Sequence, residues 1–494
     1  MVVFWTTFLS LLAIAYYLLY KYMTRNFSYW KDRNIFYFKP LPFFGNLLPM
    51  ITMKTTMGEL IMDLYRQTDK DYFGIFSLDR PVLVVKSPKL AKDILLKDFA
   101  SFHDRIIVTP DTDPAMSNLM FFKKGQMWKV IRSKMTPVFT SGKLKAMFSV
   151  MVDESNDLSK YLSKFVGAPS IEAKEVCAKY STNLIALTAF GVKAKCFDNE
   201  DADFRKLGRR IFGTSLTNAV RQLGCNFFPG LIKTFGIEFV DTVAREQMKS
   251  IFSTVLKARK QSDHHKSNDL VDILLDARAH TESGISDDMI LGQAIQFFMA
   301  GFESVASTIS FTLYALSMDE EIQERLRLEI LENIEENNGL TYEGVNSMKY
   351  LNMVISEALR KYPVLPFLDR ECTSTYKVEG TDLVLEKGQA IYISAFGMHY
   401  DEKYFPDPDK FDPERFSDKN EINKEGFYYT PFGEGPRICI GNRYGLLAVK
   451  VGIASILSKY KIRKSLKTPE KIKFDPKSFL IQSYGGVPIK IEAL

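Results

Sequence analysis

The sequence predicts a mainly α-helical domain with small β-sheets, an α+β fold built around one long central helix and preceded by a single transmembrane helix. Three observations carry this prediction. Residues 2–20 contain no charged side chain, helical periodicity dominates from residue 88 onward, and the region 363–436 is rich in the Pro and Gly that punctuate short strands and ordered loops.

The N-terminal segment 1–21 is expected to be a membrane anchor. As a helix its uncharged part reaches roughly 28 Å, about the thickness of a bilayer's hydrocarbon core. Lys21 and Arg25 follow at once, so positive-inside logic leaves the rest of the chain in the cytosol. The alternative, a cleaved signal peptide, lacks support because no basic n-region and no small-x-small cleavage site is present.

Residues 22–39 are interpreted as a basic linker, and residues 40–494 as one domain because no flexible segment divides them. Two strands are expected at 72–78 and 81–86. Ser286 is a good N-cap for the longest helix, with Asp287 and Asp288 in its first turn. The predicted helices are 88–97, 124–137, 143–164, 178–190, 202–216, 237–260, 286–318, 319–335, 349–361 and 440–458.

Charge and cysteine content exclude several classes of protein. The 65 Lys and Arg against 59 Asp and Glu give a net charge of +6, interleaved along the chain, so no basic surface for nucleic acid is expected. The five cysteines are odd in number and widely spaced, which argues against a disulfide framework and a structural zinc site and favours a reducing compartment.

The strongest candidate site is the loop 431–443, which reads PFGEGPRICIGNR. Gly433 and Gly435 permit backbone geometry that other residues resist. Cys439 stands where an apolar helix is expected to begin, so helix-terminal N–H groups and Arg437 would favour its thiolate. A shielded single sulfur suits a soft metal ligand or a nucleophile. The alternative is a buried cysteine at an ordinary helix start.

The pattern Phe-x-x-Gly-x-Arg-x-Cys-x-Gly in this loop resembles the haem-binding signature of the cytochrome P450 family. The resemblance implies the cytochrome P450 fold, with the long helix over the haem and residues 40–494 as a haem-thiolate monooxygenase domain. It makes Cys439 the metal ligand, on the iron of haem b (iron protoporphyrin IX). Phe432 would pack beside the sulfur, and Arg437 would contact a haem propionate.

Further motifs match the same family in the same order along the chain. Trp128 and Arg132, spaced as Trp-x-x-x-Arg on one helix, would contact the propionates, and Arg370 is a further candidate. A core tryptophan beside a surface arginine is the ordinary interpretation of that pair. Glu357 and Arg360 lie three residues apart on a helix and, with Arg415 of the segment Pro-Glu-Arg-Phe, would form a buried structural network.

The long helix carries Gly301, Glu303 and Ser304 within the sequence Ala-Gly-Phe-Glu-Ser. The resemblance implies an oxygen-activation segment in which Gly301 opens the helix for dioxygen and water, while Glu303 and Ser304 relay protons. Family members most often have threonine where Ser304 stands, and serine lacks the methyl group that restrains the rotamer. The alternative is a glycine-weakened helix with two polar residues facing solvent.

The implied reaction inserts one atom of O2 into a lipophilic small molecule, either a xenobiotic or an endogenous lipid or hormone. No Gly-x-Gly-x-x-Gly fingerprint and no Walker A loop occurs, so electrons are expected from NADPH through a separate partner, NADPH–cytochrome P450 reductase, with cytochrome b5 as a further candidate. Lys129 and Lys134 could form the docking face for reductase, although each is equally well explained as a solvated lysine.

The match is to the microsomal class and is similar to the branch of insect detoxification and vertebrate drug-metabolising enzymes, which implies a single-pass protein of the endoplasmic reticulum membrane. Two rival functions remain: a haem-thiolate isomerase or dehydratase that acts on peroxides without reductase, and a non-catalytic haem-binding protein. The residues expected around the substrate are apolar. They are Phe102, Phe121, Phe297, Phe298, Ala300, Val364, Leu365, Phe367, Phe479, Ile481 and Tyr484.

Overall fold

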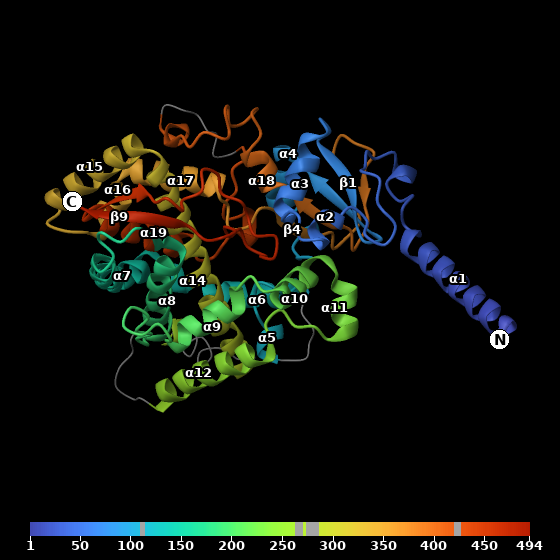
Figure 1. The fold of residues 1–494 in the computed structure, drawn as a ribbon, viewed down its shortest axis with the longest axis horizontal. Coiled ribbons are helices and arrows are strands. Elements are labelled where there is room, and N and C mark those ends of the chain that lie inside the picture. The colour runs from blue at the N-terminus through green and yellow to red at the C-terminus, as the bar shows by residue number, and fades with distance from the viewer. Residues whose placement is uncertain (109–113, 262–269, 273–285, 419–425) are drawn as a thin grey trace.

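The structure is a computed structural model that describes residues 1–108, 114–261, 270–272, 286–418 and 426–494. Helices form the larger body of the molecule, and a smaller body with the principal sheet lies on the side from which α1 projects (Figure 1). The α-helices are α1 Val2–Thr24, α2 Leu48–Ile51, α3 Met57–Arg66, α4 Pro88–Lys92, α5 Pro114–Ser117, α6 Gly125–Met135, α7 Ser141–Ser163, α8 Ala173–Phe190, α9 Asp203–Phe212, α10 Leu216–Phe227, α11 Pro229–Phe235, α12 Thr242–Gln261, α14 Asp287–Met318, α15 Glu320–Glu336, α16 Tyr342–Ser347, α17 Lys349–Lys361, α18 Ala395–His399 and α19 Asn442–Leu457.

The strands make three small sheets within the described residues. The largest has the order β1-β2-β7-β4. In this sheet β2 and β7 are parallel, whereas the pairs β1–β2 and β7–β4 are antiparallel. A second has the order β3-β9-β8, and the third is the pair β5-β6. The strands are β1 Tyr72–Ser77, β2 Arg80–Val85, β3 Ile171–Glu172, β4 Leu368–Glu371, β5 Tyr376–Lys377, β6 Val384–Leu385, β7 Ala390–Ile393, β8 Tyr460–Lys464 and β9 Pro488–Ala493.

Among the residues that the structure describes, two helices are long and apolar enough to cross a membrane, and they differ in burial. In α1 no residue is buried, and Phe43 packs against its Tyr16 and Tyr20 with ring centroids 6.0 and 6.5 Å apart. In α14, 78% of the most apolar 18-residue stretch is buried inside the domain. The helix α1 therefore presents the apolar surface that a bilayer could cover, whereas α14 is the core helix of the domain.

The central helix α14 is 32 residues long and begins where its capping residues predict. The hydroxyl of Ser286 accepts a hydrogen bond from the backbone N–H of Met289 at 3.2 Å, and Asp287 and Asp288 occupy the first turn, where the helix dipole favours negative charge. Helices α8, α19 and α5 pack against it. A helix buried on most sides can carry functional residues at fixed positions on one remaining face.

Most predicted helices are present within a few residues of their predicted ends, and 349–361 is α17 to the residue. The helix predicted at 202–216 ends earlier, at Phe212, and α10 begins separately after a Ser215 cap. The helices α2, α3, α5, α10, α11, α16 and α18 were not predicted. Thr56 and Glu59 form a capping box at α3, and their spacing in the sequence is the pattern that indicates such a helix start.

The segment 22–39, predicted as a basic linker, is largely packed onto the domain. Trp30 is fully buried, and its indole N–H donates to the carbonyl of Ile75 in β1 at 3.1 Å. Gly74 lies under this indole, because a Cβ added there would come within 2.4 Å of the ring. The aromatic residues of the segment explain this packing, because the free energy gained by burying their rings exceeds the gain from leaving the neighbouring basic side chains in solvent.

Candidate active site

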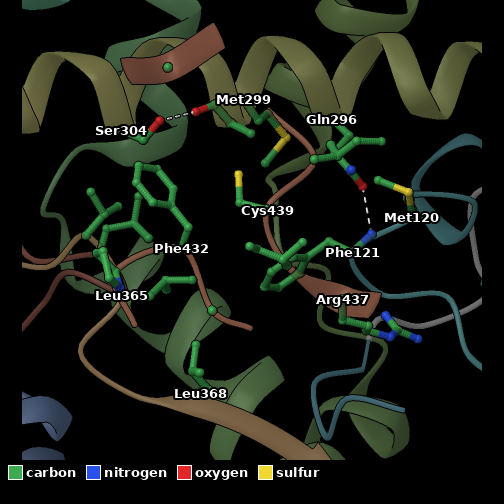
Figure 2. A pocket seen from close by; sticks show the side chains of 18 of the residues that line it. Met120, Phe121, Gln296, Met299, Ser304, Leu365, Leu368, Phe432, Arg437 and Cys439 are labelled. Carbon is green, nitrogen blue, oxygen red and sulfur yellow. Dashed lines mark hydrogen bonds between the residues drawn. The ribbon is translucent and has the colours of Figure 1, made fainter. Parts of the chain in front are cut away.

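The cysteine loop is a tight turn between the sheet body and α19. Gly433 and Gly435 both have φ of +71°, a conformation that favours glycine. A Cβ on Gly435 would come within 1.8 Å of the Leu95 carbonyl oxygen, so no residue with a side chain fits at this position of the turn. The backbone N–H of Cys439 donates to the Phe432 carbonyl at 2.9 Å. These constraints fix the direction of the sulfur, which points into a cavity toward α14 (Figure 2).

Cys439 lies deep in the molecule, and its accessible surface faces the cavity. Burial raises the pKa of its thiol above the ordinary value of 9.0, although the Gly441 backbone amide and the charges of Arg132 and Arg105 act in the opposite direction. The sequence predicted that a helix terminus would favour the thiolate, but α19 begins only at Asn442. The thiolate therefore requires a stronger stabiliser, such as a metal ion, which deprotonates a coordinating thiol.

The cavity has a volume of about 310 Å³ and lies between the cysteine loop and α14. Its walls are mainly aromatic and aliphatic, with a few polar groups, as is typical of small-molecule sites. The lining residues are Arg105, Leu119, Met120, Phe121, Phe122, Trp128, Arg132, Phe212, Phe239, Gln296, Met299, Ala300, Ser304, Val305, Thr308, Leu359, Val364, Leu365, Leu368, Pro431, Phe432, Gly433, Arg437, Ile438, Cys439, Ile440, Gly445, Leu446, Val449, Phe479 and Leu480.

One face of α14 lines this cavity. Ala300 and Ser304, one turn apart, lie on it, and the Ser304 hydroxyl donates to the Ala300 carbonyl at 2.6 Å. Thr308, one turn further and not predicted, also lines the cavity, and its hydroxyl donates to the Ser304 carbonyl at 2.9 Å. The spacing 300, 304 and 308 was the sequence signal that could have identified Thr308.

The structure corrects the predicted positions of Gly301 and Glu303, neither of which lines the cavity. Successive helical residues point about 100° apart, so neighbours of a cavity-facing residue turn elsewhere. Gly301 faces α8, where a Cβ would come within 2.6 Å of the Ile185 side chain. Its small size therefore serves the packing of α14 against α8 and does not widen the cavity.

Glu303 is buried on another side of α14, in a polar cluster. Its carboxylate accepts hydrogen bonds from Lys174 Nζ at 2.6 Å and from Gln482 Nε2 at 3.0 Å. Lys174 also donates to the Ser307 hydroxyl at 3.1 Å, and its side chain is 21% exposed. Lys174 and Gln482 were not predicted from the sequence. Through them the Glu303 carboxylate is linked to a side chain that reaches the surface.

Arginines gather on the cavity wall beside the cysteine loop. The guanidinium of Arg437 lies over the ring of Trp128 at 4.1 Å and donates to the carbonyls of His103, at 2.5 Å, and Lys123, at 2.8 Å. Burial and the nearby charges of Arg105 and Arg370 lower the pKa of Arg437 to about 8. Arginine keeps its proton in proteins, so this depression means that the positive charge is held at a free-energy cost.

Arg370 and Arg105 complete this cluster. Arg105, which was not predicted, pairs with Asp369 at 2.6 Å and lies 4.3 Å from the ring of Phe121. Arg370 is fully buried and does not line the cavity, and its Nε has no hydrogen-bond partner among the described residues. Burial and repulsion from Arg105 lower the pKa of Arg370 to about 9.

The charges of this wall fit a cofactor with two carboxylates. Within the described residues, the acidic partners of Arg105, Arg370 and Arg437 are Asp369 and Asp104, the latter 3.6 Å from Arg437. Arg132 adds a fourth arginine, whose side chain donates no hydrogen bond within the described part of the chain, and burial lowers its pKa. Carboxylates accept strong hydrogen bonds from arginine. Haem has an iron that binds thiolate, an apolar porphyrin ring and two propionates, and the sulfur, the apolar walls and the arginines match these three features in turn.

The loop is supported from behind by a buried ionic network. The guanidinium of Arg360 donates to both carboxylate oxygens of Glu357, at 2.7 and 2.8 Å, and both side chains are fully buried. Arg360 also donates to the carbonyls of His399 and Pro408. Arg415 lies 3.6 Å from the same Glu357. The predicted network of these three charges is present in the structure.

His399 was not predicted and joins this network to the cysteine loop. Its Nδ1 lies 3.1 Å from the Arg360 carbonyl, and its Nε2 accepts the backbone N–H of Thr430 at 3.2 Å. Since a carbonyl only accepts, Nδ1 carries the proton and the ring is neutral. Burial and the charge of Arg360 lower the pKa of His399 to about 3. Thr430 directly precedes the loop, so His399 ties the position of the loop to α17.

Of the apolar residues predicted around the substrate, Phe121, Ala300, Val364, Leu365 and Phe479 line the cavity. The other six lie elsewhere. Phe297 and Phe298 face away on α14, and Tyr484 is 63% exposed. Phe102, Phe367 and Ile481 pack into other parts of the core. An apolar side chain fits a core and a cavity equally well, so composition alone could not separate the two groups.

Comparison with known proteins supports the match to a haem-thiolate family along nearly the whole chain. A family model described as Cytochrome P450 matches residues 37–488. The chain is 38% identical to a protein named Cytochrome P450 6j1 from Blattella germanica, over 96% of this chain and 95% of that protein. It is 35% identical to Cytochrome P450 6k1 of the same insect, over 97% and 95%. It is 36% identical to Probable cytochrome P450 6g2 from Drosophila melanogaster, over 98% and 97%.

Proposed function

The chain belongs to the cytochrome P450 family, as a haem-dependent monooxygenase of its insect detoxification branch, and from this premise we propose its substrate class and electron source. The protein inserts one atom of O2 into a lipophilic small molecule, and the other oxygen atom leaves as water. The cofactor is haem b. The electrons originate in NADPH and arrive through a separate reductase, because the sequence carries no nicotinamide or flavin fingerprint.

The observation that supports this proposal is the position of one sulfur. Cys439 faces the Ala300–Ser304 turn of α14 across an apolar cavity, and arginines crowd the adjoining wall (Figure 2). When bound, a haem with thiolate ligation supplies oxygen chemistry, because the thiolate favours cleavage of the O–O bond. The apolar walls exclude water and hold the substrate. Arg437, Arg132, Arg105 and Trp128 line the cavity and would hold the propionate side, with the charge of the buried Arg370 behind them.

Two residues of α14, Glu303 and Ser304, are assigned to the delivery of protons to the cavity. The Ser304 hydroxyl gives its hydrogen to the Ala300 carbonyl, so its oxygen lone pairs remain available as acceptors at the cavity surface. Glu303, directly before it, holds a carboxylate on the side of Lys174. We propose that protons from the surface pass along Lys174 to Glu303, and that water would complete the path from Glu303 to the Ser304 oxygen.

The reductase approaches from the side of α6, where Lys129 is exposed and Lys134 is partly exposed. We assign these lysines to the docking face, with cytochrome b5 as a second electron donor. Reversal of both charges should raise the apparent KM for reductase at low salt, and high salt should remove the difference. An unchanged KM would exclude these two residues from docking.

The protein is placed in the endoplasmic reticulum membrane, spanned once by α1, with the domain in the cytosol. The apolar, unburied α1 and the basic residues that follow it support this orientation. The substrates then reach the cavity from the lipid phase. Protease treatment of sealed microsomes should digest the domain, and its protection would contradict the orientation.

The decisive test combines a spectrum with a stoichiometry. The ferrous protein exposed to carbon monoxide should show the red-shifted Soret band of thiolate coordination. With added reductase and a lipophilic substrate, it should consume NADPH and O2 in proportion to product. A haem-thiolate isomerase or dehydratase would show the band and act on peroxides without NADPH. A non-catalytic haem protein would consume no NADPH above the reductase background.

A further inference from the structure

Two glutamines one turn apart on α14 hold the segment 118–121 against this helix. Gln293 Nε2 donates to the carbonyl of Asn118 at 2.6 Å, and Gln296 Oε1 accepts the backbone N–H of Phe121 at 2.8 Å (Figure 2). Both contacts join a glutamine amide to the backbone of this segment, with Gln293 as the donor and Gln296 as the acceptor. The residues differ in their surroundings, because Gln296 lines the cavity whereas Gln293 is buried away from it.

The contact with Phe121 also determines which way the Gln296 amide faces. A backbone N–H can only donate, so the side-chain oxygen must lie against it and the NH2 group must lie on the other branch of the amide. Among the described residues nothing accepts a hydrogen bond from Gln296 Nε2. The amide therefore keeps two donors, at a residue that lines the cavity.

The surroundings of this amide are mostly apolar. Phe121, Met120 and Met299 line the same part of the cavity (Figure 2). A donor in an apolar wall gains when a ligand supplies an acceptor, because a desolvated N–H without a partner costs free energy. Gln296 precedes Ala300 by one helical turn, about 6 Å along the helix axis.

We propose that Gln296 is a specificity-determining residue whose Nε2 donates a hydrogen bond to an acceptor oxygen of the substrate. This inference rests on the proposed function and narrows its substrate class to lipophilic molecules that carry a carbonyl, ester or ether oxygen. The bond places the oxygen near Gln296 and brings the part of the molecule about one turn further along α14 against Ala300 and Ser304. Hydrocarbons without an acceptor bind only through their apolar surface.

The test uses two ligands of nearly equal shape, benzophenone and diphenylmethane, which differ by a carbonyl in place of a methylene group. Their dissociation constants are measured by equilibrium dialysis on the full-length, haem-loaded protein in detergent. Gln296→Met should weaken benzophenone binding about tenfold and leave diphenylmethane binding nearly unchanged. Gln296→Glu keeps an acceptor for the Phe121 N–H but removes the NH2 donors, and should lose the same preference.

Gln293→Met is the matched control, because it removes the equivalent contact with the same segment outside the cavity. It should change the two affinities by the same factor or leave both unchanged. If Gln296→Met also weakens both ligands equally, Gln296 only pins Phe121 and the proposal is wrong. If neither affinity changes in either Gln296 variant, the proposal is equally wrong.

The carbon monoxide spectrum of each preparation separates this inference from the proposed function. A thiolate band together with an unchanged benzophenone preference overturns the role of Gln296 alone. Absence of the band in the folded wild-type protein overturns the proposed function, whatever the ligand preference.

Discussion

The two sides of the cavity are built on different principles. On the side of the cysteine, Glu357, Arg360 and His399 form a buried network in which most polar groups are bonded to backbone carbonyls or to each other. On the side of α14, Gln296 keeps donors and Ser304 keeps lone pairs that nothing in the described chain uses. The first side fixes a geometry, and the second leaves hydrogen-bonding capacity for molecules that come and go.

The contrast teaches where substitutions should act. In a saturated network, removal of one member strands a buried partner and costs stability. On an open face, removal of one group leaves the fold intact and changes selectivity or proton delivery.

Replacement of Glu357 by glutamine should be the most damaging change. It leaves the fully buried Arg360 with no carboxylate partner, and breaking such a pair costs about 3–5 kcal/mol. The denaturant midpoint and the haem content of the purified protein measure this loss. The matched control is Lys145→Gln, which breaks the exposed pair with Glu343 and should change neither quantity appreciably. Equal effects of the two variants would remove the distinction between buried and exposed pairs.

Arg437→Gln should weaken retention of haem. The variant loses a positive charge on the propionate side, and a hydrogen bond to a charged group is worth about 1.5–3 kcal/mol, so transfer of haem to apomyoglobin should accelerate at least tenfold. Arg443→Gln serves as the control, because Arg443 is an exposed arginine of the same loop that bonds Ser141. If haem leaves both variants at the wild-type rate, the arginine cluster does not hold the propionates.

His399→Gln should change the acid sensitivity of stability. The folded pKa of His399 is lowered from 6.5 to about 3, so on acidification the unfolded chain takes up a proton that the folded chain refuses. The stability is complete above pH 6.5 and is lost as the pH falls toward 3. At pH 5 this loss is about 2 kcal/mol, from the two pKa values.

The glutamine variant lacks this ionisation, so its denaturant midpoint should fall less than that of the wild type between pH 7 and pH 5. Between pH 7 and pH 8 the two proteins should change in parallel, which provides the internal control. Identical acid sensitivity of both proteins would show that the ring of His399 is not held neutral.

Ser304→Ala should leave the fold, haem content and substrate affinity unchanged and lower the product formed per NADPH oxidised by a few-fold, with the balance released as peroxide. Ser304→Thr should raise this ratio, because the added methyl group restrains the hydroxyl rotamer. Coupling measurements with reductase compare the three proteins. If the alanine variant couples as well as the wild type, Ser304 has no part in proton delivery.

The sequence predicted the saturated side better than the open side. Cys439, Arg437 and the pair Glu357–Arg360 lie in short motifs, where local spacing and special backbone geometry leave a visible pattern. Arg105 acts through a contact with β4, more than two hundred residues away along the chain. His399 acts through contacts with α17 and with the residue that precedes the cysteine loop, each more than thirty residues away. No local pattern marks such contacts.

The open side depends on which way each residue of α14 faces. Placement of the helix was predictable from its cap and periodicity, whereas its rotation was not, because the helix is buried on most sides. For this reason Gly301 and Glu303 were assigned to the cavity, and Gln296 and Thr308 were overlooked. A hydrophobic stripe indicates rotation only when the opposite face meets water.

The crowding of Arg105, Arg370 and Arg437 has a consequence for the life of the protein in the cell. Before the cofactor arrives, like charges in a poorly solvated wall oppose closure of the loop that carries Cys439, and binding of a dianionic prosthetic group removes that opposition. A newly synthesised chain is therefore expected to gain stability when it binds the porphyrin.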